Sequence, residues 1–274
     1  MSDANTGQLG HESRLKLMAI IAVAKSRGLF PANPKIVDAL PGREVSIPLV
    51  DESVTPVAYK QQQYNPIQAD IVNNQVDIWL KSGVVRPSTS FRCCRTSIMK
   101  GTDGSNRLTI DHRPLNAVTK KDSGGIGTQA TMHHRMKGSN FFTLLDLPSA
   151  YHMLSIREAD RHKTAFRDAR GRLYEFTRCG FGLTTIPAVF SAHLGDTLRP
   201  VEVKSHVERW LDDILLHSAS LADHFALIEE VFDLLHQAGY SLHFRKSMFC
   251  MSEVEFLGAM AGQVFGRRRR RSRG

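Results

Sequence analysis

Residues 206–218 read HVERWLDDILLHS, two runs of strand-forming residues on either side of adjacent aspartates. These runs predict two strands that fold back on each other at residues 211–213, although the loop lacks the glycine of the commonest tight turns. Residues 141–147, FFTLLDL, form a nearly continuous apolar run, which is typical of a buried strand that ends in a carboxylate, Asp146. The sequence therefore places acids at the ends of two hydrophobic strands.

Adjacent carboxylates between buried strands favour a metal site. Asp212 and Asp213 would repel each other, and burial would penalise both charges. A divalent cation relieves both problems, and hard oxygen ligands with room for water and phosphate describe Mg²⁺. If Asp146 meets the tip of the hairpin, the three acids could hold two metal ions for phosphoryl transfer. From the residues alone, solvent-exposed acids in turns remain the alternative.

Two helices have clear ends. Asn65 caps the first, with proline next to it, and Gly83 ends it. Ser220 caps the second, and Gly239 ends it. We expect their apolar faces to be formed by Ile67, Ile71, Ile78 and Trp79 in the first helix, and by Leu221, Phe225, Ile228, Phe232 and Leu235 in the second.

The other segments mix helix and strand. Residues 1–57 contain five prolines, which permit one early helix followed by an extended linker with little core of its own. Residues 84–122 read as short strands broken by prolines and by the Asp-Gly turn at 103–104. Residues 187–198 resemble a helix, and residues 254–257 a strand. Helices and strands without strict alternation predict an α+β fold.

Charge and cysteine content are weak guides to function here. The net charge of the 274 residues is +9, but six charges are arginines within residues 267–273, so the rest carries +3. Bulk charge therefore argues only weakly for a polyanionic partner. The four cysteines show no C-x-x-C spacing, which suits a reducing compartment. No apolar run is long enough for a membrane span, so we expect an intracellular protein, cytoplasmic or nuclear, without membrane contact.

Six stretches form an ordered set of motifs: GVVRPSTS (83–90), DGSNRLTIDHRPLNAVTKKD (103–122), LDLPSAYHMLSIREADRHKTAF (145–166), FGLTTIPAVF (181–190), WLDDILLHS (210–218), and AGYSLHFRKSMF with VEFLG (238–258). In order and spacing they resemble the reverse transcriptases of gypsy-type long-terminal-repeat retrotransposons. The first two stretches resemble the fingers of that family, and the others resemble its palm motifs. The resemblance extends over residues 41–262.

This resemblance implies a right-hand polymerase of the α+β class, with fingers and a palm whose antiparallel sheet is backed by helices. It divides the chain into an N-terminal linker region (1–57), a fingers-like region (58–140), the palm (141–262) and a basic tail (263–274). No thumb is expected, although the family continues into thumb, connection and ribonuclease H. The implied function is RNA-directed DNA polymerisation: two Mg²⁺ ions would assist addition of dNTPs to a primer on an RNA or DNA template.

The resemblance also assigns roles to individual residues. Asp146, Asp212 and Asp213 take the catalytic, metal-binding positions. Arg107 would grip the incoming triphosphate and Tyr151 would pack under its sugar, although a solvated strand arginine and a core tyrosine are the plainer alternatives. The remaining nucleotide-binding positions are Lys100, Phe181, Gly182, Leu211 and Lys246, and the primer grip is Phe256, Leu257 and Gly258.

Two of these roles have simple structural alternatives. Lys246 takes the position proposed as general acid for the leaving pyrophosphate, but a lysine after an amphipathic helix is more often only solvated. Residues 256–258 would hold the primer or form a plain buried strand.

Several residues depart from the family pattern. Trp210 stands where the hairpin usually has tyrosine, and Lys100 alone remains of a run of lysines, which weakens the second triphosphate contact. Residues 91–99, FRCCRTSIM, replace an apolar strand, so packing of the fingers is expected to suffer. The alternative function is therefore a catalytically inactive, nucleic-acid-binding remnant of a decayed element. An RNA-templated RNA polymerase is a further alternative, against which Leu211 and Tyr151 argue.

Overall fold

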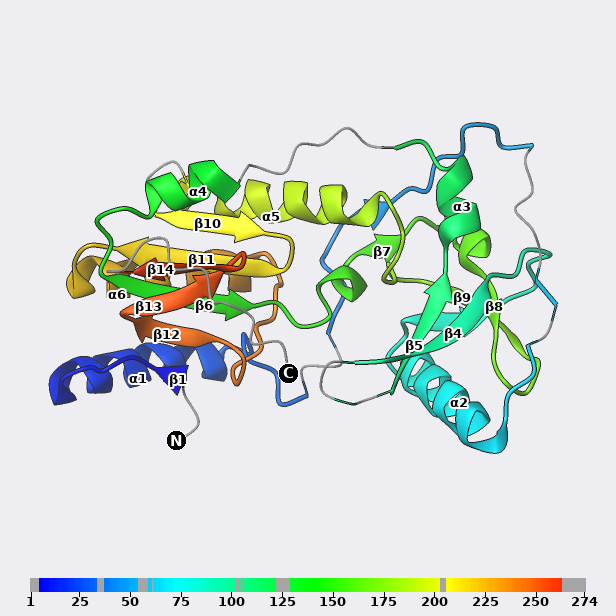
Figure 1. Ribbon diagram of the computed structural model, residues 1–274, viewed down its shortest axis with the longest axis horizontal. Coiled ribbons are helices and arrows are strands. Elements are labelled where there is room, and N and C mark those ends of the chain that lie inside the picture. Colours follow the sequence, from blue (N-terminus) through cyan, green and yellow to red (C-terminus); the bar gives the residue numbers. More distant parts are fainter. Residues whose placement is uncertain are drawn as a thin grey trace, which may run out of the picture. The chain divides into compact units, whose positions relative to one another are not determined.

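The structure is a computed structural model that describes residues 5–33, 37–53, 59–60, 62–101, 104, 106–121, 129–202 and 206–262. The chain forms two compact units, each assembled from segments that are distant in the sequence (Figure 1). The basic tail, residues 263–274, lies outside the described residues. Unit 1 comprises Met1–Lys35, Gly125–Ser149 and Ser191–Gly274, and unit 2 comprises Ile36–Gly124 and Ala150–Phe190.

A five-stranded sheet organises unit 1 (Figure 1). Its strands, in sheet order, are β1 (Asn5–Thr6), β12 (Met248–Met251), β6 (Phe141–Asp146), β11 (Asp213–Ser218) and β10 (Val207–Trp210). All neighbours pair antiparallel except β1 and β12, which are parallel. The central place of β6 explains its nearly continuous apolar sequence. The predicted hairpin, the predicted buried strand and the antiparallel sheet are all confirmed.

Helices back this sheet on one face. The helix α6 (Leu221–Gln237) contacts β11 and β6, and α1 (His11–Ser26) packs on α6. The predicted cap is confirmed, because Ser220 Oγ accepts a hydrogen bond from Asp223 N at 3.2 Å. Four members of the predicted α6 stripe are buried, namely Phe225, Ile228, Phe232 and Leu235. Among the other described helices, α4 (Gln129–Arg135) belongs to unit 1, and α5 (Ile186–Glu202) has residues in both units and confirms the helix expected at 187–198.

The opposite face of the sheet is covered by a hairpin of β13 (Glu253–Phe256) and β14 (Ala259–Gly262). Phe142 of β6 and Leu215 of β11 share a core cluster with Phe256, Val254 and the methionines of the α4 region. The predicted strand at 254–257 is thus confirmed. Both faces of β6 are buried, so only the end of this strand can present a side chain to a substrate.

The described residues of unit 2 form three small sheets: β2 (Glu44–Val45) with β7 (Ser155–Ile156), β3 (Val85–Pro87) with β9 (Leu173–Phe176) and β8 (Phe166–Arg167), and β4 (Arg95–Lys100) with β5 (Asn106–Asp111). Its helices are α2 (Pro66–Lys81), α3 (Arg113–Val118), and the short 3₁₀ helices η1 (Ala150–Met153) and η2 (Glu158–Thr164). The expectation that Pro114 only interrupts strands is wrong. It lies in the first turn of α3, where the missing N–H of proline costs nothing.

The helix α2 begins at its predicted cap but buries a different face. Val72 and Val76 are fully buried, whereas Ile67 and Ile78 are 74% and 46% exposed. Of the residues predicted for the buried face, Trp79 does pack inward, with its ring 5.4 Å from that of Phe176. The sequence carries apolar residues on both sides of this helix, and tertiary packing selects the valine side.

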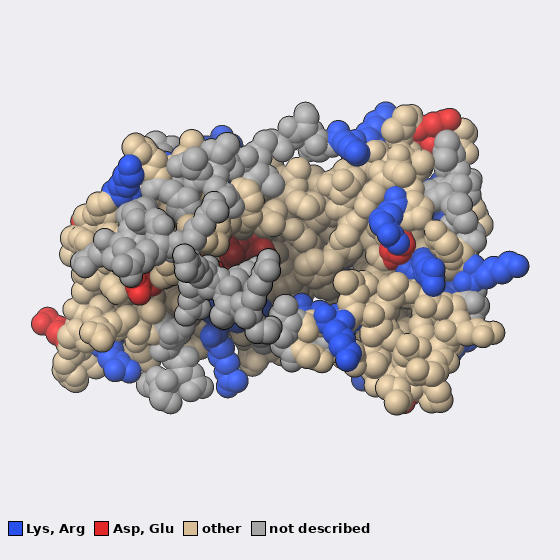
Figure 2. Space-filling view, viewed as in Figure 1, with Lys and Arg blue, Asp and Glu red and all other residues tan. Residues whose placement is uncertain are grey.

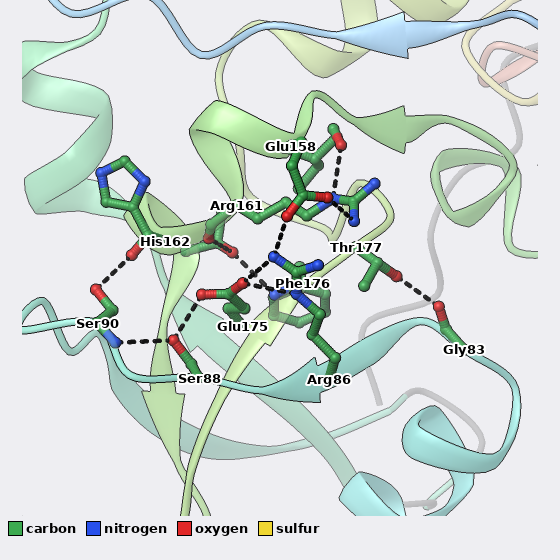
Figure 3. A network of polar contacts seen from close by, with 12 residues as sticks. Gly83, Arg86, Ser88, Ser90, Glu158, Arg161, His162, Glu175, Phe176 and Thr177 are labelled. Carbon is green, nitrogen blue, oxygen red and sulfur yellow. Dashed lines mark hydrogen bonds and ion pairs between the residues drawn. The ribbon is translucent and has the colours of Figure 1, made fainter.

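A polar network joins β3, β9 and η2 (Figure 3). Glu175 is buried, and its carboxylate accepts hydrogen bonds from Arg86 Nε at 2.8 Å and from Ser88 Oγ at 2.6 Å. Arg86 also pairs with Glu158 of η2. Because the buried carboxylate has donors on both oxygens, the network stabilises the junction of these three short elements.

The N-terminal region contributes more to the core than expected. The early helix is confirmed as α1, but the expectation of a linker with little core is wrong. Residues 37–53 are anchored through Ile47, whose backbone N donates to Asp160 Oδ2 at 3.1 Å and whose carbonyl accepts from Lys163 Nζ at 2.8 Å. The buried apolar residues of the region are Leu17, Ile20, Ile21, Ala24, Leu29, Phe30, Val37, Leu40, Val45, Ile47 and Leu49.

The described surface gives little indication of a partner. Among the described residues, no helix has the length and apolar character needed to cross a membrane. On the face drawn in Figure 2, Lys and Arg side chains lie in several separate places, and no continuous basic stripe is visible outside the grey atoms. The functional surface is therefore better sought from individual side chains than from bulk charge.

A buried histidine connects three elements of unit 1. The ring of His224 on α6 lies 2.8 Å through Nε2 from Thr143 Oγ1 and 3.0 Å through Nδ1 from Ser218 Oγ. Ser218 Oγ donates to Ser220 O, and Thr143 Oγ1 accepts from Cys250 N. A neutral ring protonated on Nδ1 satisfies every partner. Burial, with a contribution from neighbouring His217, lowers the pKa of His224 to about 4.

We expect His224 to make folding sensitive to mild acid. Its pKa in the unfolded chain is the ordinary 6.5, so below that pH the unfolded chain binds a proton that the folded chain excludes. The free energy of unfolding should fall from pH 6.5 towards 4, and His224 should contribute up to about 1.4 kcal/mol per pH unit. Urea unfolding at a series of pH values should show that the unfolding free energy of His224→Gln depends less steeply on pH than that of wild type. An equal pH dependence in the two proteins would contradict the role of His224. The control is His236→Gln, at an exposed position on α6.

Candidate active site

The predicted strands place their carboxylates side by side. Trp210 pairs with Asp213, so the loop of the hairpin consists of Leu211 and Asp212. Asp213 also pairs with Asp146 at the end of β6. Leu211 has a φ of 55°, a left-handed conformation that a leucine seldom adopts. Such backbone strain persists only where the surrounding pairing determines the turn, and it is typical of functional sites.

The backbone brings two of these carboxylates onto the same face of the sheet. Leu147 N donates to Asp212 O at 3.1 Å, beyond the Asp146–Asp213 pair, so that pair is of the non-hydrogen-bonded kind. Side chains approach most closely in such pairs. Because side chains alternate along a strand, Asp146 shares the face of Phe142, which packs under β13 and β14. The carboxylates of Asp146 and Asp213 therefore lie on the face opposite α6.

Negative charge accumulates at this edge. Burial raises the pKa of Asp213 to about 6, and the charges of Asp212 and Asp146 add to the shift. Burial also raises the pKa of Asp146, against the lowering effect of Lys246 and His243. Lys246 Nζ lies 3.6 Å from Asp146 Oδ1, but its side chain is 63% exposed. One solvated lysine does not balance three carboxylates.

The donor set suits a hard divalent cation. Carboxylate oxygens are the ligands that Mg²⁺ prefers, and a cation would relieve the mutual repulsion that raises the pKa of Asp213. Within the described ranges, no three His, Cys, Asp or Glu side chains are grouped closely enough to form a complete metal site. Strand pairing thus places the carboxylates of Asp146 and Asp213 side by side without forming a complete ligand cluster.

Lys100 and Arg107 lie on the hairpin of β4 and β5 in unit 2, on opposite faces. Arg107 pairs with Met99, and Lys100 pairs with Asn106. Cross-strand partners share a face, and neighbours along a strand alternate. The structure therefore does not bring Lys100 and Arg107 to one face of this hairpin.

Tyr151, Phe181 and Gly182 lie together in unit 2. The half-buried ring of Tyr151 meets Phe181 and Phe190 edge-on, with centroids 5.2 and 5.9 Å away. Phe181 is 59% exposed. Gly182 has a φ of 91°, which side-chain-bearing residues rarely adopt, and its carbonyl accepts from Asn116 Nδ2 at 2.7 Å. This glycine is thus required by backbone conformation, and the ring of Tyr151 is held by aromatic packing.

The predicted primer grip forms a tight turn. Phe256 pairs with Ala259, and between them Leu257 and Gly258 have φ values of 55° and 74°. Two successive positive φ values are the mark of the type I′ turn common in hairpins. The side chain of Phe256 is buried in the same core cluster as Phe142. For this residue the structure therefore shows a plain buried strand, which is the alternative to the primer grip. Leu257 and Gly258 form the tip.

Comparison with known protein families shows to which family the chain belongs. Residues 98–261 match the family model described as reverse transcriptase (RNA-dependent DNA polymerase). The chain belongs to the reverse transcriptase family. Reverse transcriptases are nucleotidyltransferases, so the predicted enzyme class is confirmed, and all three carboxylates lie within the matched residues.

Relatives of this chain include transposon polyproteins. The Tf2-3 and Tf2-7 polyproteins of Schizosaccharomyces pombe are each 30% identical to it over 224 residues. The alignment covers 82% of this chain but only 17% of each polyprotein. The chain thus spans about one sixth of the length of these relatives.

Solved structures support the fold of fingers and palm. A foamy viral protease-reverse transcriptase in complex with an RNA/DNA hybrid is 22% identical, with a TM-score of 0.82 over 95% of this chain and 34% of its own. The native prototype foamy virus protease-reverse transcriptase is 25% identical, with a TM-score of 0.82, over 97% of this chain and 34% of its own. The predicted α+β fold of a right-hand polymerase is confirmed.

The predicted site residues of this reverse transcriptase divide between the units. Two neighbours of Asp146 were not predicted: His243 N donates to Asp146 O at 2.8 Å, and Ser247 Oγ accepts from Asp146 N at 3.3 Å. No motif signals these contacts, because they involve the backbone of Asp146. Unit 1 carries Asp146, Leu211, Asp212, Asp213, Lys246, Phe256, Leu257 and Gly258, and unit 2 carries Lys100, Arg107, Tyr151, Phe181 and Gly182.

Proposed function

We propose that this chain is the RNA-directed DNA polymerase part of a gypsy-type long-terminal-repeat retrotransposon polyprotein and adds dNTPs to a primer 3′ end. The observation that carries the proposal is the pairing of Asp213 with Asp146 beside the Leu211-Asp212 turn. It brings acids from two distant motifs to one edge of a sheet, as metal-assisted phosphoryl transfer requires. The transposon polyproteins among the relatives support the origin.

Asp146, Asp212 and Asp213 would hold two Mg²⁺ ions. Bound there, the ions would activate the primer hydroxyl and stabilise charge on the leaving pyrophosphate. The protein keeps the ligands in place: pairing of β6 with β11 fixes two of them, and the hydrogen bond from Leu147 N fixes the backbone of the third. Lys246, 3.6 Å from Asp146, is positioned to give a proton to the pyrophosphate.

The proposed partners are an RNA or DNA template with its primer, and dNTPs. Foamy viral relatives have been solved with an RNA/DNA hybrid and with double-stranded DNA, which supports nucleic-acid binding. Arg107 would grip the triphosphate with its planar guanidinium, and Tyr151 would pack under the sugar. The other proposed contacts are Lys100, Phe181, Gly182 and Leu211 for the nucleotide, and Phe256, Leu257 and Gly258 for the primer.

Primer extension tests the proposal directly. The 274-residue chain should extend oligo(dT) on poly(rA) with dTTP in the presence of Mg²⁺. Chelation of the metal should stop extension, since the carboxylates alone cannot activate the hydroxyl. A folded protein that binds this primer-template but adds no nucleotide would overturn the polymerase proposal.

One observation favours the alternative of an inactive nucleic-acid-binding remnant. Arg92 is 5% exposed, and its Nε and Nη1 find no hydrogen-bond partner among the described residues. Buried donors without acceptors destabilise a fold, and these two lie in the stretch 91–99 that departs from the family pattern. In that case the protein would retain primer-template in a filter-binding assay and extend no primer.

Replacing Tyr151 with valine should weaken discrimination against ribonucleotides. The ring is held by Phe181 and Phe190, and a close-packed wall under the sugar would collide with a 2′ hydroxyl. We expect the ratio of rNTP to dNTP incorporation to rise by roughly tenfold. Single-nucleotide incorporation kinetics would measure it, with Tyr151→Phe as the matched control. Unchanged discrimination in the valine variant would remove this role.

A further inference from the structure

A turn formed by residues 243–247 binds both backbone polar groups of Asp146. His243 N donates to Asp146 O at 2.8 Å, and Asp146 N donates to Ser247 Oγ at 3.3 Å. Ser247 Oγ donates in turn to His243 O at 2.9 Å. The hydroxyl of Ser247 therefore closes a set of three hydrogen bonds around the end of β6.

The hydroxyl of Ser247 has no ready substitute. Asp146 and Asp213 form a non-hydrogen-bonded pair, so β11 offers the amide of Asp146 no acceptor. Ser247 is fully buried, and water is excluded from that position. The same turn carries Lys246, whose Nζ lies 3.6 Å from Asp146 Oδ1. One side chain thus sets the position of the carboxylate-bearing strand end relative to the lysine beside it.

We propose that Ser247 is a positioning residue that aligns Asp146 with Lys246. The proposal rests on the function proposed above, in which Asp146 is a catalytic carboxylate. Ser247 acts through the backbone of Asp146 and touches no substrate. Small displacements of a catalytic group cost rate steeply, because the reacting atoms must stay within a narrow range of distances.

Ser218 provides a matched control. It is also a buried serine of unit 1, with Oγ 2.9 Å from Ser220 O and 3.0 Å from His224 Nδ1. It pairs with Phe141, at the end of β6 opposite Asp146. Ser247→Ala and Ser218→Ala each remove a buried hydroxyl with two partners, so both should lower the melting temperature by a few degrees. Only the first should disturb the carboxylates.

The experiment compares single-turnover primer extension and primer-template affinity. Ser247→Ala should lose about tenfold to a hundredfold in rate, with the Kd for primer-template within about twofold of wild type. Ser218→Ala should keep its rate within about twofold, and Ser247→Thr, which retains the hydroxyl, should recover most of the lost rate. Equal rate losses in the two alanine variants, or a wild-type rate in Ser247→Ala, would overturn the proposal.

Hydrogen exchange separates this proposal from that of polymerase activity. The amide of Asp146 should be protected in wild type and in Ser218→Ala, and should lose protection in Ser247→Ala. This pattern in a chain that extends no primer would leave the positioning of Asp146 intact and reject only the polymerase function. An unprotected amide in the wild-type protein would refute the role of Ser247.

Discussion

Replacing Asp212 with asparagine should reduce the rate of nucleotide addition by at least about a thousandfold. The amide keeps the shape of the side chain but loses the charge that would hold Mg²⁺. The fold should be unaffected, because Asp212 is exposed at the tip of the turn and contributes its carbonyl, not its carboxylate, to the bond with Leu147 N. Rapid-quench primer extension with saturating dNTP would measure the rate.

The control is Asp233→Asn, which removes an exposed carboxylate from α6 in the same unit. Asp233 is 51% exposed and pairs with Arg27, and it has no part in the proposed site. This variant should extend primers at the wild-type rate, and both variants should melt within about 2 °C of wild type. Wild-type extension by Asp212→Asn would show that the metal assignment is wrong. Equal loss in both variants would indicate a general effect of charge.

Local signals explain the parts of the fold that sequence reasoning could predict. The cap at Ser220, the apolar stripe of α6 and the uninterrupted apolar run of β6 each act over a few neighbouring residues. The hairpin at Leu211 was predicted from its flanking strands, although its left-handed leucine gives no local signal. The site itself was predicted from the ordered family resemblance, because hydrophobic periodicity cannot show that Asp146 pairs with Asp213.

Features decided by tertiary packing could not be predicted in the same way. In α2, apolar residues occur on two sides, and only the packing of unit 2 shows that Val72 is inside and Ile67 outside. The bonds from residues 243–247 to Asp146 join its backbone groups to the amide of His243 and the hydroxyl of Ser247, and no local pattern pairs positions so distant in the sequence. The burial of Phe256 likewise depends on β6 and β11 lying beneath its hairpin. Such contacts come from chain segments that are distant in the sequence.

Arg92 is the residue at which sequence and fold disagree most strongly. Its stretch, 91–99, was expected to pack poorly, and the structure buries this arginine to 5% exposure. Two of its guanidinium nitrogens meet no acceptor in the described part of the chain, and Cζ lies 5.8 Å from the centroid of the Phe91 ring. A single contact of this kind with an exposed ring offsets little of the cost of desolvating a charge.

Replacing Arg92 with methionine should therefore stabilise the protein. Methionine keeps an unbranched apolar stem and removes the buried charge, and substitutions of this kind raise the free energy of unfolding by about 1–4 kcal/mol. We expect a rise within that range, because the described residues offer no acceptor to Nε or Nη1 of Arg92. Urea unfolding at constant pH would measure it, with Arg95→Met as the control, since Arg95 is an exposed arginine on β4.

The outcome also bears on whether this chain is an enzyme or a remnant. If Arg92→Met is more stable and also extends primers faster at 37 °C, residues 91–99 reduce activity by destabilising the fold, and the carboxylate site supports nucleotide addition. If it gains stability without gaining any extension, the defect lies in the chemistry, and the inactive remnant is favoured. A loss of stability would contradict the prediction, because the contacts of the Arg92 side chain would then outweigh the cost of burying its charge.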